Sequence, residues 1–544
     1  MNPLRINDLD NRAYAHQMRI WNHPNVTEEI AEVVKEPLYR PFVANKLAKI
    51  PDDFHKPILK EYGDRSIEGE EAKANKWLRE SIEETFENSR LALNSDDEDI
   101  SNYAERKAKM IQDVLARQMI NVSESVISWI EKVCENAGIN PPHQNSLLSK
   151  IQRVCDPKWW RKRLRKDLMR RREAGAIKMG FVHSKAGLYI SNYGLERQRQ
   201  QNKRSLEFLL GMEAVNEIGE VIDLSEIFNS NVCNPKIRFI EMVTRVKGIE
   251  EYAKQLGLVG MFTTTTCPSS MHARLKESSR RNSKYDGTNP KEAHQYLCKQ
   301  WSKTRAECDR QGIDILFLRI AEPHHDGTPH WHTLVFVDPL QKAKLTQIMR
   351  HYALERDGNE RGAKDTRFKS EDIDLNKGSA VGYVIKYIAK NVDGKNVGLD
   401  YESNNEDVST TVERVTAWAR TWGIRQFQFS ENCPVTIYRE LRKVRNKPKI
   451  ESMYPHWHAC SNGDFHGFIN AMRAAPLILV TEKKQSDRYP DEQIDVIRGV
   501  KFNEDFLETR IHTWVFRKKD SSAVSWTCVN NCTNFINNFK KKYN

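Results

Sequence analysis

Residues 313–339, IDILFLRIAEPHHDGTPHWHTLVFVDP, hold two β-rich runs separated by a short turn. The first run ends in Glu322, and the second begins at His330. Two such runs on either side of a turn that contains glycine predict a β-hairpin. Because side chains alternate along a strand, His330 and His332 should lie on one face and Trp331 on the other. The hairpin therefore offers one face for a site and the other for a core.

Two imidazoles on one strand face are close enough to share a divalent ion. Glu322, across the turn at the end of the paired strand, is placed to supply a hard oxygen ligand, and either turn histidine, His324 or His325, is an alternative. A lone His-x-His on a strand is more often a hydrogen-bonded polar pair at a sheet edge. The interpretation as a metal site therefore depends on the rest of the chain.

The tetrapeptide PHWH occurs a second time, in YPHWHACSNG from Tyr454. From Phe465 to Met472, apolar side chains recur at helical spacing after a Ser-Asn-Gly-Asp turn. This copy has no neighbouring strand text that would supply a carboxylate. We expect His456 and His458 in a loop or a first helical turn, with a role in packing or at the surface.

A helix is predicted from GSAVGYVIKYIAKNVDG, which begins at Gly378. Ser379 can cap this helix. Four side chains that fall at i, i+3, i+4 and i+7 share one face: Tyr383, Lys386, Tyr387 and Lys390. Most tyrosines with this spacing border a hydrophobic core. The alternative is a pair of nucleophiles, because adjacent ammonium groups and a metal-bound phosphate favour the phenolate over the phenol.

Strand-like and helix-like segments alternate over residues 256–429. GMFTTTTCPS, from Gly260, predicts a strand that runs into a turn. Residues 289–312 predict a helix with a proline near its start and a glycine at its end. Trp418 and Trp422, one turn apart, are expected in the core and not as base-stacking platforms. These segments predict a single α/β unit.

Length and charge set wider bounds. A chain of 544 residues with 39% apolar content is expected to fold as a soluble protein of about two to four domains. Its net charge of +12 favours a polyanionic partner, of which nucleic acid is the commonest, although a generally basic surface is the plainer explanation. No apolar run reaches about 18 residues, so no membrane span is expected. The scattered cysteines fit a reducing cytoplasm.

A basic segment, DPKWWRKRLRKDLMRRREAG from Asp156, predicts a helix with an apolar seam and a strongly basic remainder. Arginines along one rod can neutralise successive DNA phosphates, and a solvated basic face explains them equally well. The candidate DNA-binding residues here are Arg161, Lys162, Arg163, Arg165, Arg170 and Arg171. Lys299, Lys303 and Arg305 are further candidates beside a single-stranded DNA path.

The segments FTTTTCPSSMH, PHWHTLVF and YVIKYIAK, in this order, resemble the three motifs of HUH endonucleases in the two-tyrosine superfamily. Together with DPKWWRKRLRK and AWARTWGIRQFQF, they resemble more closely the bacteriophage replication gene A protein family of rolling-circle initiators. The match covers roughly residues 156–443. His-x-His alone and Tyr-x3-Tyr alone are weak signals, but both together, on a strand and then on a helix, are specific.

The resemblance implies an α+β fold whose central antiparallel sheet has HUH-endonuclease (RRM/palm-like) topology. We expect the sheet to carry helices on one face, with the histidines on an inner strand and the tyrosine helix above them. Mainly helical N- and C-terminal regions would flank it. The expected parts are a helical accessory region (1–150), a basic helical DNA-contacting region (151–250), the HUH endonuclease domain (251–445) and a C-terminal region of unknown role (446–544).

By the same resemblance, His330, His332 and Glu322 would hold Mg²⁺ or Mn²⁺, and Tyr383 and Tyr387 would be the nucleophiles. Lys386 and Lys390 match the lysines beside them. The implied enzyme is a site-specific single-strand DNA endonuclease and ligase that nicks a phage origin through a 5′-phosphotyrosine intermediate and so starts rolling-circle DNA replication.

Three other classes of protein stay open at this point. They are a two-tyrosine rolling-circle transposase, a non-catalytic origin-binding protein and a metal-dependent hydrolase that uses water. The implied partners are single-stranded and origin DNA, a host helicase and the replicative polymerase, in the cytoplasm of a bacterial host. A nucleotide cofactor is not expected, since the chain has no Gly-x4-Gly-Lys-Ser/Thr loop.

Overall fold

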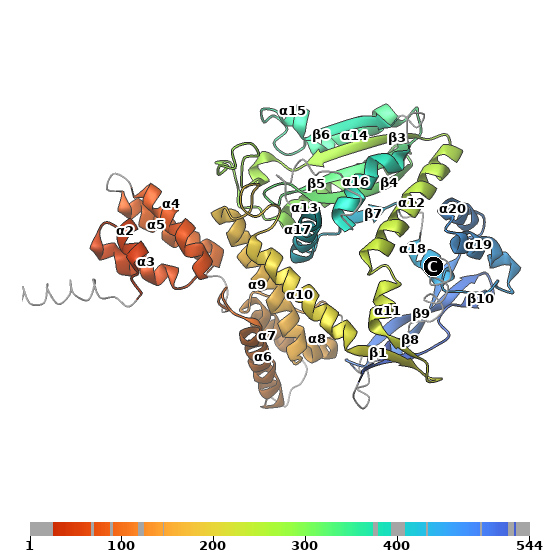
Figure 1. Ribbon diagram of the computed structural model, residues 1–544, viewed down its shortest axis with the longest axis horizontal. Coiled ribbons are helices and arrows are strands. Elements are labelled where there is room, and N and C mark those ends of the chain that lie inside the picture. Colours follow the sequence, from red (N-terminus) through yellow and green to blue (C-terminus); the bar gives the residue numbers. More distant parts are fainter. Residues whose placement is uncertain are drawn as a thin grey trace, which may run out of the picture. The chain divides into compact units, whose positions relative to one another are not determined.

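The computed structural model contains two compact units, Met1–Phe181 and Val182–Asn544 (Figure 1). The residues that it describes are 25–66, 70–86, 91–117, 124–144, 146–373, 379–392, 408–430, 434–489, 492–519 and 527–528. In this part of the chain, no helix is long and apolar enough to cross a membrane. The division of the chain into four functional regions stays a prediction.

The first unit is helical throughout its described residues, as expected. Its elements are α2 (Glu28–Val33), η1 (Pro37–Tyr39), α3 (Arg40–Leu47), η2 (Asp52–Phe54), α4 (His55–Arg65), α5 (Glu71–Phe86), α6 (Asp97–Arg117), α7 (Glu124–Glu135), α8 (Leu147–Val154) and α9 (Pro157–Met179). The basic segment forms α9. Asp156 caps its first turn by accepting a hydrogen bond from the Lys158 backbone N–H, and Gly180 ends it in the left-handed conformation.

The second unit contains a five-stranded sheet in which every pair of neighbours is antiparallel. In spatial order its strands are β6 (Phe368–Ile373), β3 (Val259–Thr266), β5 (Pro329–Val337), β4 (Ile315–Pro323) and β7 (Phe427–Phe429). The predicted hairpin is β4–β5, and its register pairs Glu322 with His330. The histidine strand β5 lies at the centre of the sheet, as expected.

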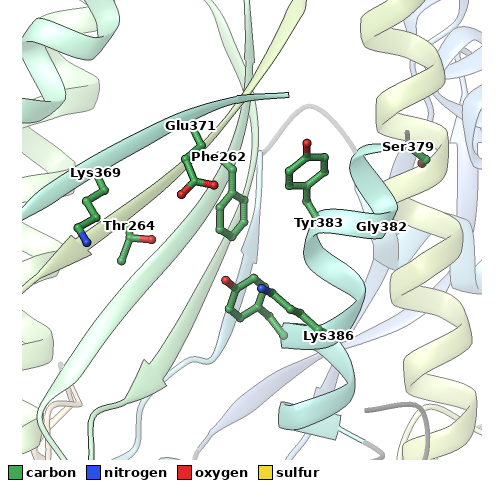
Figure 2. A pocket seen from close by; sticks show the side chains of 9 residues that line it. Phe262, Thr264, Lys369, Glu371, Ser379, Gly382, Tyr383 and Lys386 are labelled. Carbon is green, nitrogen blue, oxygen red and sulfur yellow. The ribbon is translucent and has the colours of Figure 1, made fainter. Parts of the chain in front are cut away.

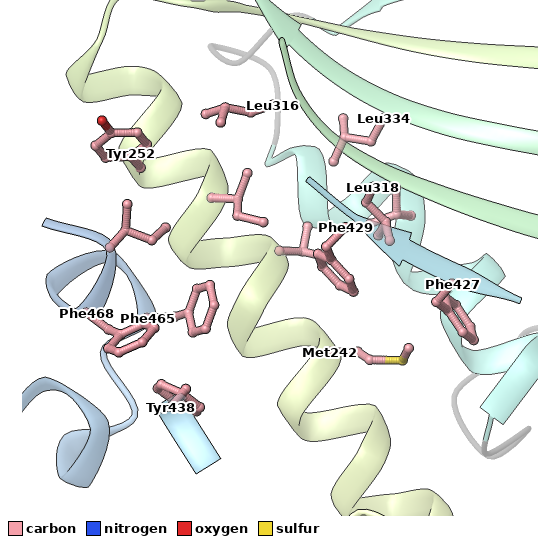
Figure 3. Close-up of a cluster of buried hydrophobic side chains, with 14 of the residues drawn as sticks. Met242, Tyr252, Leu316, Leu318, Leu334, Phe427, Phe429, Tyr438, Phe465 and Phe468 are labelled. Carbon is pink, nitrogen blue, oxygen red and sulfur yellow. The ribbon is translucent and has the colours of Figure 1, made fainter. Parts of the chain in front are cut away.

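One face of this sheet packs on α12 (Pro235–Gln255) and α16 (Ala380–Val392). Figure 3 shows α12 between the sheet, represented by Leu318 and Leu334, and the C-terminal helices, represented by Phe465. Burial of each large apolar side chain contributes about 1.5–3 kcal/mol to folding. Helix α16, which carries the tyrosines, is therefore held against the sheet by a shared hydrophobic core.

The opposite face of the sheet is covered by α13 (Pro290–Arg310) and α14 (Lys342–Ala353), so the expectation of helices on one face only is wrong. Trp301 of α13 lies edge-on against Phe317, with ring centroids 5.0 Å apart, and His294 against Trp331. The physical reason is that all nine residues of β5 are buried. A strand whose two sets of side chains are both buried requires cover on both faces.

The remaining helices of the second unit are α10 (Asn192–Leu210), α11 (Leu224–Asn229), η3 (Ser269–Met271), α15 (Ala363–Thr366), α17 (Val408–Trp422), α18 (Val435–Leu441), η4 (Glu451–Met453), α19 (Tyr454–Asn462) and α20 (Phe465–Ala474). Trp418 and Trp422 of α17 are buried, as expected. The second PHWH forms the first turn of α19. There His456 is buried and hydrogen-bonded to the Ala475 carbonyl, and His458 is exposed, so one histidine packs and the other lies at the surface, as expected.

The C-terminal region is not mainly helical, which corrects the expectation. Beyond α20 it forms strands: β8 (Ile478–Gln485), β9 (Gln493–Phe502), β10 (Asp505–Glu508), β11 (Trp514–Lys518) and β12 (Thr527–Cys528). The first three form one antiparallel sheet, and the last two join β1 (Met212–Asn216) and β2 (Val221–Asp223) in another. The apolar spacing after Ser461 extends only to the end of α20, and the β-branched residues beyond it form strands.

Candidate active site

Three potential metal ligands meet where β4 ends and β5 begins. Glu322, His330 and His332 are all buried, and one ligand atom from each lies within 4.8 Å of the others. The strand register explains the grouping: Glu322 lies directly opposite His330, and His332 follows two residues later on the same face. The structure thus brings together the three residues that the sequence nominated as ligands.

The two imidazoles direct the same ring nitrogen at one point. The Nε2 atoms of His330 and His332 are 3.0 Å apart. The Nδ1 atom of His332 lies 3.0 Å from the hydroxyl of Thr264, its neighbour on β3, and this contact fixes the orientation of the ring. Burial lowers the pKa of His330 far below its usual range and that of His332 to about 3.

Both rings are therefore neutral at physiological pH, which is the state that binds a metal. The Nε2 atoms of both rings are close enough to bind one ion, and the Glu322 carboxylate adds negative charge beside them. A set of two nitrogens and one oxygen suits a divalent cation of the Mn²⁺ or Mg²⁺ type. The residues present fit such an ion.

The carboxylate of Glu322 is oriented by residues from two other elements. Asn391, at the end of α16, donates a hydrogen bond of 2.6 Å to Glu322 Oε1, and Gln426 in turn donates to the Asn391 side-chain oxygen. The Lys390 ammonium lies 4.0 Å from Glu322 Oε2 and 5.3 Å from the centre of the Tyr189 ring. Asn391 and Gln426 were not identified from the sequence, since only the folded register reveals their contacts.

Tyr387 lies directly beside this cluster. Its ring centroid is 4.1 Å from that of His332 and 5.3 Å from that of Phe262, with which it stacks. Burial raises the pKa of Tyr387, and the Lys386 ammonium, 4.7 Å from the ring centre, opposes that rise. The predicted face of α16 is confirmed, because Val384 and Ile388 are buried in the core on its other side.

Tyr383 lies one helical turn before Tyr387 and lines a smaller pocket of about 420 Å³. Figure 2 shows Tyr383 and Lys386 on the helix side of this pocket and Lys369 and Glu371 on the strand side. Tyr387 and Lys386 line both this pocket and the larger cavity around the ligands. The two tyrosines therefore have different surroundings although they share one helix face.

The cavity over the ligands has a volume of about 1000 Å³ and a basic lining. Arg367 and Glu360, which both line it, form an ion pair with each other. The other lining cations are Arg274, Lys276, Arg361, Lys369, Lys386 and Lys390. Glu322 is the only other carboxylate on the described lining, so the cavity concentrates positive potential where an anionic ligand would approach.

The turn histidines do not join the three ligands but pack beside them. The ring of His324 stacks on that of His330 at 4.1 Å, and His272 meets His324 edge-on. Asp326, which is fully buried, lies 3.2 Å from His272 Nδ1 and accepts the Thr328 backbone N–H. Asp326 therefore ties the loop after β3 to the β4–β5 turn, and neither turn histidine is needed to replace Glu322.

The predicted DNA-binding residues of α9 belong to the other unit. Arg161 and Lys162 are exposed, whereas Arg165 pairs with Asp97 and Arg171 with Asp167. The remaining two candidates are partly buried: Arg163, whose guanidinium lies 4.0 Å over the Trp159 ring, and Arg170. A DNA-binding role for these six residues stays a prediction.

The three other basic candidates, Lys299, Lys303 and Arg305, lie on α13, which covers the sheet face away from the ligands. None of them lines the cavity, and Lys303 forms an ion pair with Glu355. These positions do not support the expected DNA path beside them.

The site thus consists of a buried His–His–Glu cluster on an antiparallel sheet, with a tyrosine-bearing helix packed beside it. A family model described as bacteriophage replication gene A protein (GPA) matches residues 70–395, which include the His–His–Glu cluster and both tyrosines. The chain belongs to this family. The match confirms the resemblance to the bacteriophage replication gene A protein family.

Several curated proteins are similar to the chain. The replication gene A protein of Escherichia phage 186 is 36% identical over 424 residues, covering 72% of this chain and 60% of the relative. The probable replication protein P12 of Pseudoalteromonas phage PM2 is 34% identical over 407 residues, covering 72% and 63%.

A protein of Salmonella paratyphi A, named probable replication endonuclease from prophage-like region, is 35% identical over 296 residues, covering 54% of this chain and 37% of the relative. The chain thus spans less than two thirds of the length of these relatives. No solved structure matches it.

Proposed function

We propose that this chain is a metal-dependent DNA nicking and joining endonuclease that starts rolling-circle replication of phage DNA. The observation that carries the proposal is the position of Tyr387, whose ring lies 4.1 Å from the ring of His332 in a basic cavity that Glu322 and His330 also line. A phenol beside a metal-binding cluster suits attack on a phosphodiester. The relatives named replication gene A protein and probable replication endonuclease support this assignment.

In this mechanism, Glu322, His330 and His332 would hold Mg²⁺ or Mn²⁺, which supplies charge stabilisation at the scissile phosphate. The Tyr387 oxygen attacks phosphorus, a bond forms between them, and the bond from phosphorus to the 3′-oxygen breaks. The products are a 5′-phosphotyrosine and a free 3′-hydroxyl. Lys386, beside the Tyr387 ring, favours the attacking phenolate and offsets the unfavourable effect of burial.

The two tyrosines would act at different steps. Tyr387 contacts His332 and is placed for the first cleavage, whereas Tyr383 lines the adjoining pocket one turn away. After a full circuit, Tyr383 would attack the regenerated junction, and the new 3′-hydroxyl would close on the first linkage. The energy of the phosphodiester is conserved through both steps, so joining needs no nucleotide cofactor.

The same proposal names partners. The free 3′-hydroxyl would prime the replicative polymerase, and a host helicase would separate the strands in the cytoplasm of the bacterial host. Single-stranded origin DNA would bind through six basic residues that line the cavity: Arg274, Lys276, Arg361, Lys369, Lys386 and Lys390. We expect the affinity for oligonucleotides to fall as the salt concentration rises. In Lys369→Gln, the slope of log affinity against log salt concentration should be smaller.

The test is incubation with labelled single-stranded DNA from the origin region of the encoding genome, in Mn²⁺, followed by denaturing electrophoresis. We expect a protein–DNA adduct in the unmodified chain and none in Tyr383→Phe/Tyr387→Phe or in His330→Ala. Tyr387→Phe should slow the first cleavage more than Tyr383→Phe. Cleavage without an adduct would instead assign water as the nucleophile and make the chain a hydrolase.

A further inference from the structure

The pocket beside Tyr383 is lined by a carboxylate, Glu371, that has no role in the proposed mechanism. Figure 2 shows Glu371 and Lys369 on the strand side of this pocket, facing Tyr383 across Phe262. Glu371 pairs with Phe262 in the register of β6 and β3, so its side chain lies on the same sheet face as the metal ligands. The pocket volume of about 420 Å³ falls within the range of small-ligand sites.

Glu371 is exposed and forms no ion pair or hydrogen bond within the described residues, although Lys369 and Lys386 line the same pocket. Charged residues on an edge strand such as β6 also oppose strand addition. Asp372 has a partner on the other face of β6, where it forms an ion pair with Lys342. Glu371 instead presents an unused acceptor to the tyrosines.

A free carboxylate in a groove that attracts phosphates repels the DNA backbone, and this repulsion weakens binding. Such a residue favours binding when it accepts a hydrogen bond from the ligand. The donors on the bases of single-stranded DNA are the exocyclic amines of cytosine, adenine and guanine and the ring N–H groups of thymine and guanine, and the amines extend farthest from the ring. The lining also includes the ring of Tyr383, which is partly exposed, and exposed aromatic rings stack on bases.

We propose that this pocket is a base subsite for the nucleotide next to the scissile phosphate, in which Glu371 accepts a hydrogen bond from the base amine. The subsite therefore favours a base that carries an exocyclic amine, such as cytosine, over the same ring without the amine. Lys369, beside Glu371 and in the larger cavity as well, contacts the adjoining phosphate. This inference rests on the proposed function and adds a specificity-determining residue to it.

The test measures binding without cleavage, in the full chain with Tyr383→Phe/Tyr387→Phe, which keeps both rings but has no nucleophile. The probes are labelled homo-oligonucleotides of deoxycytidine and of 2-pyrimidinone deoxyriboside, which differ only in the exocyclic amine. A homo-oligonucleotide presents the same base in every register, so the origin sequence is not needed. Fluorescence anisotropy should show about tenfold tighter binding of the cytosine oligonucleotide.

Three further substitutions in that background separate hydrogen bonding from charge. Glu371→Leu removes the acceptor and should bring the ratio of the two affinities to about one. Glu371→Gln keeps a carbonyl acceptor and should retain part of the preference. The matched control, Asp372→Asn, removes the same charge from the opposite face of β6 and should leave the ratio unchanged.

Equal binding of the two probes by the parent, or an unchanged ratio in Glu371→Leu, overturns this inference. The adduct assay remains an independent measure of nicking and is unaffected by that result. A base preference in a chain that forms no adduct would overturn the nicking proposal and leave the base subsite standing. Failure to bind either oligonucleotide overturns the base subsite, and the adduct assay alone then decides the nicking proposal.

Discussion

Asn391 is the residue on which the geometry of Glu322 depends. Its side-chain amide donates a hydrogen bond of 2.6 Å to Glu322 Oε1, and its side-chain oxygen accepts a hydrogen bond from Gln426. Replacement by leucine keeps a similar size but removes the donor, so the carboxylate can turn away from the two histidines. We expect Asn391→Leu to weaken Mn²⁺ binding about 10- to 100-fold, measured by titration calorimetry. Asn470→Leu, which removes an amide on α20, should bind Mn²⁺ normally.

The histidines give the metal-free chain a defined dependence on pH. Burial, followed by the charges of His324, Lys390 and Lys386, lowers the pKa of His332 to about 3, whereas an unfolded histidine titrates near 6.5. Between these values the unfolded chain binds the extra proton, so the free energy of unfolding falls as pH is lowered. Urea unfolding in the presence of a chelator should show that the free energy of unfolding falls less between about pH 7 and about pH 5 in His332→Gln than in the unmodified chain. An equal loss in both chains would contradict this assignment.

The grouping of Glu322, His330 and His332 was predictable from sequence, but the residues that orient them were not. His330 and His332 could be placed on one face because alternation along a strand is a local rule. Thr264 contacts His332 only because of the pairing of β3 with β5. Such cross-strand contacts depend on register, which one sequence does not specify for strands far apart in the chain.

At the scale of single elements, the N-terminus of α16 is held by a residue from another helix. Glu250 of α12 is buried, accepts the Ser379 hydroxyl at 2.6 Å and approaches the Val381 backbone N–H at 3.4 Å. Burial opposes its ionisation, yet hydrogen bonds from Lys254 and Ser379 keep the pKa of Glu250 below its ordinary value. A negative charge at this position stabilises the first helical turn.

We expect Glu250→Gln to loosen that turn, with a loss of about 1 kcal/mol of local stability. Amide hydrogen exchange of the peptide spanning residues 379–387 should become faster. Glu251→Gln, which changes the next residue of α12, is the control and should leave the exchange unaltered. If hydrogen exchange of this peptide is the same in Glu250→Gln as in the unmodified chain, the core contacts of α16 are sufficient to stabilise the turn.

Elements with strong local signals were predicted well, and the others were not. Asn289 and Glu292 form a capping box at the start of α13, and this kind of local contact is readable from sequence. The strands after α20 were missed because polar residues interrupt them: β8 is ILVTEKKQ, and most of its side chains are partly or fully exposed. Short, half-exposed strands carry little periodicity.

At the scale of the whole molecule, the site lies entirely within the second unit, Val182–Asn544. We therefore expect a fragment of residues 182–544 to fold and to bind Mn²⁺ with the affinity of the full chain. Circular dichroism and titration calorimetry would check both points. A fragment that is folded but binds Mn²⁺ at least tenfold more weakly would show that the helical unit contributes to the site.

The β4–β5 turn determines which face of the sheet carries the His–His–Glu cluster. Glu322 and His330 are opposite one another across a connection in which Gly327 has a positive φ and its carbonyl accepts the Trp418 indole N–H. Adding one residue to β5 before His330 would invert the alternation and direct both imidazoles toward α13. A single-codon insertion or deletion there should therefore abolish metal binding. Because the same shift would turn Leu334 and Phe336 out of the core, it should also lower the free energy of unfolding.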